Sequence, residues 1–239
     1  MTAIADGIHV LSEVVLDLSD APLDFGEDRR AAIEAFWAER LARSPRLWNG
    51  PMYLFRETAI EGGVLRATAH RTDFATFLFW RSDPSSDPSI CHITGTSMPV
   101  TADEALFAVR MAAHTATAGA VYFPAGSLEA GDVSAGRFDV TRSIARELGE
   151  ETGIALSAGR LDDCFLASHV GGSFHVARRC RLPFSFSECA ARLAEHQAAT
   201  GDDEVEGAVR IGGDDDSRAL LRPYARQLAD WHFDGVGTA

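Results

Sequence analysis

Residues 146–154 constrain this chain more than any other feature, because three glutamates lie within five positions. The run reads Arg-Glu-Leu-Gly-Glu-Glu-Thr-Gly-Ile, and in a helix Glu147, Glu150 and Glu151 share one face. Like charges at this spacing repel each other and destabilise an isolated helix. Carboxylate oxygens are also the ligands that hard divalent cations such as Mg²⁺ prefer. We therefore expect these glutamates to hold a cation.

The charge of the chain limits its partners. The formal net charge of the 239 residues is −13, which disfavours a free nucleic-acid duplex as a partner. An acidic small substrate would need local help from a metal or from arginines. All 22 basic residues are arginine, so a phosphate-loop lysine and a lysine Schiff base are excluded.

The cellular location of the protein and the redox state of its cysteines are predicted from motifs that the sequence lacks. No apolar run is long enough to span a membrane, and the first six residues lack the basic segment of a secretory signal. We therefore expect a cytoplasmic protein. No two cysteines have the Cys-x-x-Cys spacing of a zinc or redox site, so we expect free thiols at Cys91, Cys164, Cys180 and Cys189.

A stretch rich in proline and serine, residues 81–88, marks the best domain boundary. It predicts an N-terminal extension over 1–88, packed on a main domain over 89–239. In the extension, hydrophobic patterning predicts a strand over 8–18, an amphipathic helix over 27–43, and a hairpin with strands at 52–56 and 63–70.

The main domain is expected to alternate strands and helices. Strands are predicted over 91–100, 104–110 and 119–124, and a strand pair joined at Gly171-Gly172 over 162–181. Helices are predicted over 140–152, 185–199 and 216–231, the last with a kink at Pro223. For the first of these, Asp139 or Thr141 can cap the start and Gly153 can provide a left-handed C-terminal cap.

The acidic helix and the loop before it, which begins at Gly126, resemble the Nudix box. The family pattern is Gly-x5-Glu-x7-Arg-Glu-U-x-Glu-Glu-x-Gly-U, where U is a bulky aliphatic residue. Residues 146–154 match every specified position of the second half. In the first half Asp132 stands where the pattern has glutamate, and six residues are inserted around 135–138.

The resemblance implies an α/β Nudix fold, an α/β/α sandwich around a mixed sheet, here with an N-terminal α+β extension. It implies a pyrophosphohydrolase with Mg²⁺ as its cofactor, or Mn²⁺ in its place. Glu150 and Glu151 would be the main metal ligands, with Glu147 as a ligand or the general base. The Gly126 carbonyl would complete the metal shell.

The resemblance also assigns roles around these ligands. Arg146 would be structural and would pair with a carboxylate to fix the loop. Asp132 can replace the loop glutamate chemically, although its side chain is one methylene shorter and the insertion affects its placement. For Glu129, which matches no specified position, a surface role is expected.

Two further groups are candidates outside the box. Nudix enzymes often use another acid, for which Glu204 is the first choice and Glu206 the second; a solvated acidic loop explains them equally well. Arg179 and Arg181 would share one face of a strand and could grip phosphate bidentately. An exposed strand face that balances a negative surface is the alternative for these arginines.

The expected substrate is a small molecule, a nucleoside diphosphate linked to another group. Spaced residues of the extension, among them Trp37, Pro45 and Gly50-Pro51, resemble UDP-glucose-cleaving Nudix enzymes, which favours a UDP-sugar cleaved to UMP and sugar 1-phosphate. The run 121–129 is similar to coenzyme A diphosphatase-like members, which gives the alternative substrate. A non-catalytic Nudix-like nucleotide-binding module also stays open. The family resemblance further allows for a homodimer.

Overall fold

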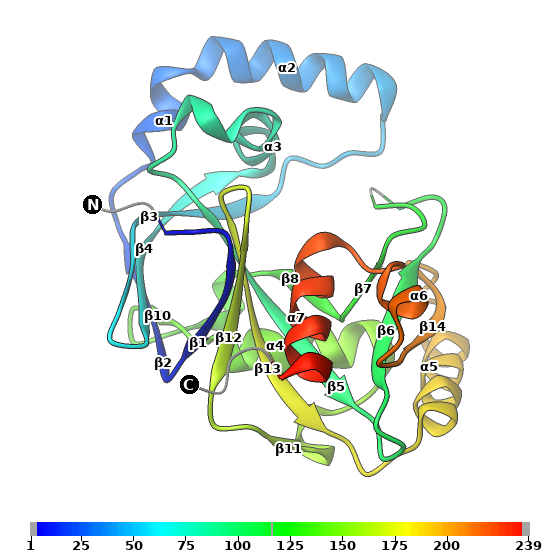
Figure 1. Ribbon diagram of the computed structural model, residues 1–239. Helices are drawn as coiled ribbons and strands as arrows, with labels where there is room; N and C mark the ends of the chain where they lie inside the picture. Colours follow the sequence, from blue (N-terminus) through cyan, green and yellow to red (C-terminus); the bar gives the residue numbers. More distant parts are fainter. Residues whose placement is uncertain (1–3, 116, 236–239) are drawn as a thin grey trace.

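The computed structural model describes residues 4–115 and 117–235, apart from the side chain of Asp215. Residues 1–3, 116 and 236–239, which include the outer ends of both predicted units, lie outside the described residues. The described chain forms two mixed β-sheets flanked by helices (Figure 1).

The larger sheet has the strand order β1-β12-β13-β5-β6-β14; in addition, β11 pairs with β13, β7 with β6 and β8 with β5. Strands β5 and β13 run parallel, whereas β12 and β13 form an antiparallel hairpin. The strand bounds are β1 Gly7–Leu11, β5 His92–Val100, β6 Leu106–Met111, β7 Val121–Tyr122, β8 Ala125–Ser127, β11 Arg160–Leu161, β12 Phe165–Val170, β13 Ser173–Arg181 and β14 Val205–Ile211.

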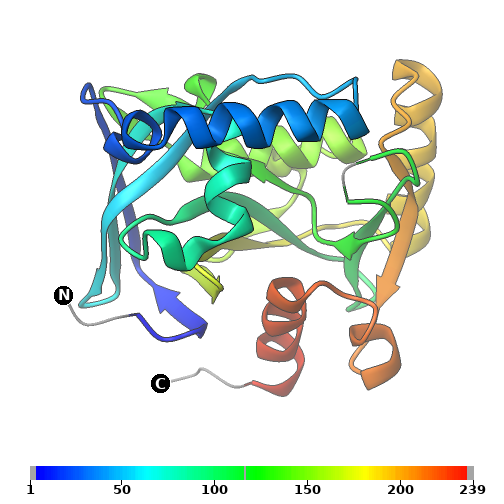
Figure 2. The ribbon, with the colours of Figure 1, turned by 90° about the horizontal axis from the view of Figure 1, so that it is seen from above.

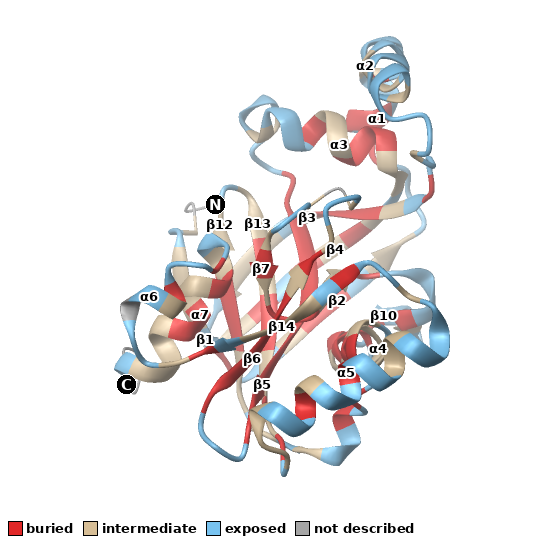
Figure 3. Cartoon of the chain, turned by 90° about the vertical axis from the view of Figure 1, so that its right-hand side faces the viewer, coloured by how far each residue is buried: buried red, intermediate tan, exposed pale blue. Residues whose placement is uncertain are grey.

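Helices cover both faces of this sheet (Figure 3). On one face lie α4 (Val140–Thr152) and α5 (Phe186–Thr200), and on the other lie α6 (Asp215–Arg218) and α7 (Pro223–Asp234). Apolar side chains of the two faces form separate clusters, one including Leu148 and Leu193, the other including Leu228. The predicted α/β class, with helices around a mixed sheet, is confirmed.

The smaller sheet has the order β3-β4-β2-β10-β9. Its strands are β2 Glu13–Ser19, β3 Pro51–Glu61, β4 Val64–Asp73, β9 Val133–Ser134 and β10 Arg137–Phe138. The helices α1 (Asp24–Asp28), α2 (Arg30–Arg43) and α3 (Phe74–Ser82) lie beside it, with α2 running along the outside of α3 (Figure 2). The predicted hairpin of the extension is confirmed by the antiparallel pairing of β3 with β4.

The single strand expected over 8–18 is wrong, because the chain divides at Ser12. Strand β1 pairs with β12 in the larger sheet, and β2 pairs in parallel with β4 in the smaller one. Leu11 and Leu16, on either side of the break, are both fully buried in one core cluster. The extension and the main domain thus share a hydrophobic core, and the boundary at residue 88 stays a prediction.

The six inserted residues of the box form a hairpin on the smaller sheet. The Leu18 N–H donates to the Gly136 carbonyl at 2.8 Å, and the Phe138 ring packs edge-on against Tyr53 with centroids 4.9 Å apart. The Asp139 N–H donates to the Asp132 carbonyl at 2.8 Å, which closes the base of the hairpin. The insertion therefore leaves the loop acid next to the start of α4.

Helix α4 has the bounds that the sequence predicts. An oxygen of Asp139 accepts from the Arg142 N–H at 3.1 Å, and Gly153 takes the left-handed conformation with φ of 70°. The last predicted helix is wrong in one respect, because residues 215–234 form two helices instead of one kinked helix. Pro223 begins α7, where its missing N–H costs no intrahelical hydrogen bond.

Among the described residues, no helix combines the length and apolar character that crossing a membrane requires.

Candidate functional site

Glu147 reaches from α4 to β8 and lies against Gly126. A Cβ atom at position 126 would overlap the Glu147 carboxylate, so the close approach depends on glycine. The side chain of Glu147 is only 12% exposed. Burial raises the pKa of Glu147 to about 7, although Arg146 opposes the shift.

Glu151 lies one helical turn further on, beside the same strand. Burial raises the pKa of this carboxyl well above its ordinary value, and the charge of Glu147 adds to the effect. The backbone N–H of Ala125 donates to the carboxylate and works in the opposite direction. Within the described part of the chain, Glu151 Oε2 is buried without a hydrogen-bond partner. Two desolvated carboxyl groups therefore lie together, and one oxygen lacks a donor.

Arg146 contacts the loop of the box at several points. Its guanidinium is 3.2 Å from Asp132 Oδ2, 3.1 Å from Glu129 Oε1 and 3.3 Å from the Ser127 carbonyl. Asp132 is 1% exposed and also accepts from the Glu129 N–H at 3.0 Å. The shorter acid is thus well placed despite the insertion. Glu129, for which only a surface role was expected, contributes to the same cluster.

Glu150 differs from the other two glutamates of the box. Its side chain is 61% exposed, and its Oε2 lies 3.1 Å from Arg146 Nη1, the atom that also lies 2.7 Å from Glu147 Oε1. Among the residues that the structure describes, no group of three histidine, cysteine or acidic side chains converges as a complete ligand set. The geometry therefore singles out Glu147 and Glu151, with Glu150 held by Arg146.

A hard divalent cation fits the pair Glu147 and Glu151. Both groups supply carboxylate oxygens, and Glu151 Oε2 is an acceptor without a donor. Both pKa values are raised because nearby positive charge does not fully offset the burial of the two groups. A cation is the kind of group that would stabilise their ionised forms. The backbone of Gly126 lies beside them on β8.

A pocket of about 700 Å³ opens at Gly126, between the extension and the main domain. One wall comes from the extension, chiefly from α3, and the other from β5, β8, β13 and the start of α7. The lining residues are Met52, Phe74, Phe77, Leu78, Trp80, Arg81, Pro84, His92, Thr94, Thr117, Tyr122, Ala125, Gly126, Ser127, Val170, Gly171, Ser173, His175, Arg222, Pro223 and Tyr224.

Two histidines of this pocket are neutral. Burial lowers the pKa values of His92 and His175 to about 3, and the charge of Arg81 lowers both further. The His175 ring stacks on Tyr224, with centroids 3.6 Å apart and ring planes 13° from parallel, and its Nδ1 lies 2.9 Å from Thr94 Oγ1. The histidines therefore contribute hydrogen-bonding atoms and a flat surface, but no charge near neutral pH.

Two arginines of the pocket were not identified from the sequence. Arg81, in the last turn of α3, lies with its guanidinium carbon 5.6 Å from the centre of the Phe77 ring. Arg222 immediately precedes α7. No sequence motif surrounds either residue, so only the tertiary structure shows that they share a pocket.

The arginines that the sequence did single out lie elsewhere. Arg179 and Arg181 flank Asp162, with Arg179 Nη2 at 2.5 Å and Arg181 Nε at 3.5 Å from its oxygens. The Arg179 guanidinium also lies over the Trp231 ring, at 4.9 Å from its centre. Neither arginine is among the lining residues of the pocket. The structure thus does not bring them to the box.

Glu204 precedes β14, and its side chain is exposed. Its backbone carbonyl accepts from the Ala112 N–H at 2.8 Å, which anchors the loop. Its negative charge contributes to the raised pKa of Glu151, so the two carboxylates lie within electrostatic reach of each other. Glu206 is exposed on β14. A catalytic role of Glu204 stays a prediction.

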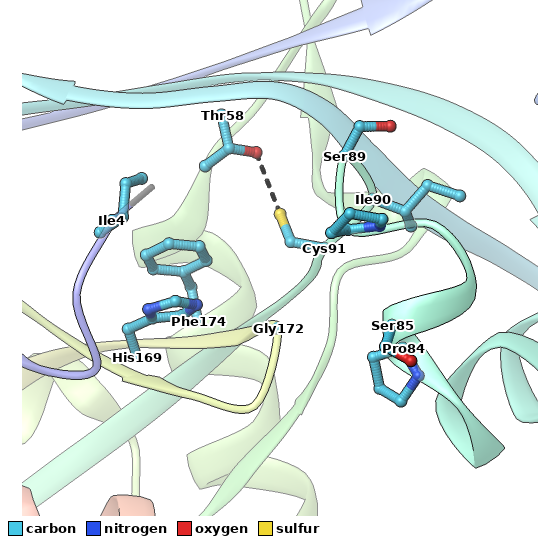
Figure 4. Close-up of a pocket in the computed structure, with 11 residues that line it drawn as sticks. Ile4, Thr58, Pro84, Ser85, Ser89, Ile90, Cys91, His169, Gly172 and Phe174 are labelled. Carbon is cyan, nitrogen blue, oxygen red and sulfur yellow. Dashed lines mark hydrogen bonds between the residues drawn. The ribbon is translucent and has the colours of Figure 1, made fainter. Parts of the chain in front are cut away.

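A second cavity of about 570 Å³ lies on the other side of Gly172 (Figure 4). Thr58 Oγ1 is 3.0 Å from Cys91 Sγ, and the His169 ring stacks on Phe174 with centroids 4.2 Å apart. Burial raises the pKa of the Cys91 thiol to about 12, so the thiol stays protonated and unreactive. This cavity contains no carboxylate of the box.

No profile of a known protein family matches the chain, and no curated protein matches it. Solved structures similar to it include the NUDIX domain of Shewanella oneidensis NrtR complexed with ADP ribose (13% identity, 67% of this chain and 98% of that chain, TM-score 0.43). A NUDIX hydrolase from Nitrosomonas europaea has 19% identity, covers 59% of this chain and 88% of that chain, and gives a TM-score of 0.40. DR0079 from Deinococcus radiodurans has 10% identity, covers 59% and 83%, and gives a TM-score of 0.41. All three of these chains are less than 20% identical to this one.

Proposed function

We propose that the chain is a divalent-metal-dependent Nudix hydrolase. Its substrate would be a nucleoside diphosphate linked to another group, cleaved at the diphosphate bond. The observation that carries this proposal is a pair of buried carboxyl groups at the wall of a pocket of about 700 Å³: Glu147 packs against Gly126, and Glu151 accepts from the Ala125 N–H. The match of residues 146–154 to the box supports it independently.

The residues of the site suit hydrolysis in separate ways. With a pKa of about 7, Glu147 can take a proton from an attacking water near neutral pH. Glu151, with its unpartnered oxygen, is the residue we expect to hold a divalent cation together with Glu147. Bound Mg²⁺ would neutralise charge on the phosphate oxygens. Through its ion pair with Asp132, Arg146 connects helix α4 to the loop that precedes it.

The size and lining of the pocket support a substrate with a flat, apolar part. Phe74, Phe77 and Tyr224 offer aromatic surfaces within a pocket large enough for a drug-sized ligand. A UDP-sugar, giving UMP and sugar 1-phosphate, is our first choice, and coenzyme A or a related nucleotide is the second. The former follows from the resemblance of the extension to UDP-glucose-cleaving enzymes.

A screen for Mg²⁺-dependent cleavage of the diphosphate bond, followed by the release of phosphate monoesters, tests the proposal. The substrates are UDP-glucose, ADP-ribose, coenzyme A and dinucleoside polyphosphates, each with and without EDTA. We expect turnover of at least one, abolished by EDTA and lowered about a hundredfold in Glu151→Gln. The matched control is Glu195→Gln, because Glu195 is exposed on α5, away from the box. An equal rate in parent and Glu151→Gln would remove Glu151 from the site.

A nucleotide-binding module is the alternative from another class. It is favoured by the position of Glu150, which is held by Arg146 and leaves the ligand set incomplete among the described residues. If no substrate in the screen is turned over but one of these nucleotides binds tightly in a separate binding measurement, the protein is a nucleotide-binding module.

A further inference from the structure

The pocket at Gly126 is positively charged, although the protein as a whole is strongly acidic. The chain has 35 acidic residues against 22 arginines. The described lining of the pocket nevertheless contains no aspartate or glutamate side chain and contains two arginines, Arg81 and Arg222. Its histidines, His92 and His175, are uncharged near neutral pH. The two guanidinium groups therefore give the pocket lining a positive net charge.

Each arginine belongs to a different wall. Arg81 comes from α3 of the N-terminal extension, and Arg222 comes from the residue before α7 of the main domain. Across the described part of the chain, neither side chain has a carboxylate within ion-pair distance, whereas Arg146 and Arg179 each have at least one. Two unpaired cations facing one cavity repel each other, and an anion between them would offset this repulsion.

We propose that Arg81 and Arg222 form an anion clamp that binds the diphosphate of a nucleotide from the two walls of the pocket. Guanidinium groups suit this role because their donors match phosphate oxygens bidentately. The aromatic surfaces of Phe77 and Tyr224, beside the two arginines, then receive a planar group attached to the diphosphate. The proposal deepens the proposed function and rests on it for the class of ligand.

The clamp gives the N-terminal extension a direct part in substrate recognition. Glu147 lies behind Gly126 and Glu151 beside Ala125, and both repel a diphosphate when they are ionised. The arginines supply the positive charge that holds the anion close to these carboxylates. Since one arginine comes from the extension, a main domain without α3 would retain only half of the clamp.

Binding of UDP in the presence of EDTA tests the clamp without catalysis. Isothermal titration calorimetry would compare the full chain with Arg81→Gln and Arg222→Gln. We expect each variant to weaken UDP binding about tenfold or more. Arg66→Gln and Arg160→Gln are matched controls, because both arginines are exposed and neither lines the pocket; we expect the affinity to change less than about twofold.

Two further measurements separate the clamp from a structural role. Arg81→Lys keeps the positive charge and is expected to recover part of the affinity that Arg81→Gln loses. The thermal unfolding midpoint of Arg81→Gln should match that of the parent, since the side chain is exposed. A midpoint that falls together with the affinity, without recovery in the lysine variant, would overturn the clamp.

Two other outcomes also overturn it. One is a parent protein that does not bind millimolar UDP, and the other is a loss in both glutamine variants no larger than in the controls. The proposed hydrolysis fails separately: UDP binding that depends on Arg81 and Arg222, without turnover of any substrate in the screen, would support the clamp and contradict the enzyme.

Discussion

Burial acts in opposite ways on the acids of the box and on the histidines of the neighbouring pocket. At the box, burial raises the pKa values of Glu147 and Glu151, so these acids tend to keep their protons. On β5 and β13, burial lowers the pKa values of His92 and His175, so these bases stay neutral. The physical cause is the same, because desolvation disfavours whichever form is charged. The box and the pocket beside it therefore each carry less charge than their titratable residues suggest.

The arginines show a second difference between the box and the pocket. Arg146, at the box, is surrounded by acids, one of which, Asp132, is 1% exposed. Arg81, in the pocket, is exposed and has an aromatic ring beside it instead. A paired arginine holds the fold, whereas an unpaired one is free to bind a ligand. Each of the following predictions tests a part of this contrast.

The largest expected effect is on stability. Arg146→Met should lower the free energy of unfolding by about 3 kcal/mol or more, because Asp132 would be left as a buried charge without its partner. Arg81→Gln should change the same quantity by less than about 0.5 kcal/mol. Urea unfolding followed by circular dichroism measures both. Equal losses in the two variants would break the distinction between paired and unpaired arginines.

Gly126→Ala should lower turnover of the substrate found in the screen about a hundredfold, or about 2.7 kcal/mol. The added Cβ would displace the Glu147 carboxylate from the site. Gly149→Ala is the matched control, because it lies in α4 and its Cβ would meet open space. That control should keep full activity and gain up to about 1 kcal/mol of stability, since alanine favours helix. Steady-state kinetics and thermal unfolding check both expectations.

The neutral state of His175 predicts that the stability of the fold decreases at acidic pH. The pKa of His175 is about 3 in the folded protein and 6.5 in its ordinary state. Below pH 6.5 the unfolded chain binds a proton that the folded chain does not. The stability present at pH 7 is therefore lost as the pH falls through 6.5 towards 3.

At pH 5 this loss should be about 2 kcal/mol for His175. Urea unfolding of the parent and of His175→Gln, at pH 7 and at pH 5, measures the contribution of His175. The contributions of the other titrating groups are the same in both proteins and cancel in the difference. A difference that is the same at both pH values would show that His175 is not kept neutral by burial.

The smallest effect is expected outside the pocket. Arg137 Nε lies 2.7 Å from Asp17 Oδ1, but both side chains are more than half exposed, at 62% and 55%. Arg137→Gln should therefore cost less than about 1 kcal/mol of unfolding free energy. A loss as large as that of Arg146→Met would mean that this pair, which joins the inserted hairpin to β2, is a principal anchor of the box.

The parts of the molecule predicted correctly are those fixed by neighbours in sequence. Helix α4 begins and ends where its caps, Asp139 and Gly153, predict, because a cap acts within one turn. The wrong prediction of a single strand over 8–18 concerns long-range pairing. The break at Ser12 arises because one segment pairs with two sheets, and no local pattern shows which strands will be its partners.

The resemblance of residues 126–154 to the Nudix box implied the class of fold, and local patterns, helical periodicity and capping, predicted the box helix and the acids that it carries. Which of these acids are desolvated depends on tertiary packing, which leaves Glu150 exposed and buries Glu147 and Glu151. The tertiary structure alone brought Arg81 and Arg222, from distant parts of the chain, to one cavity. The physical reason is that desolvation and electrostatic pairing depend on what packs around a side chain, and packing joins segments that lie far apart in sequence.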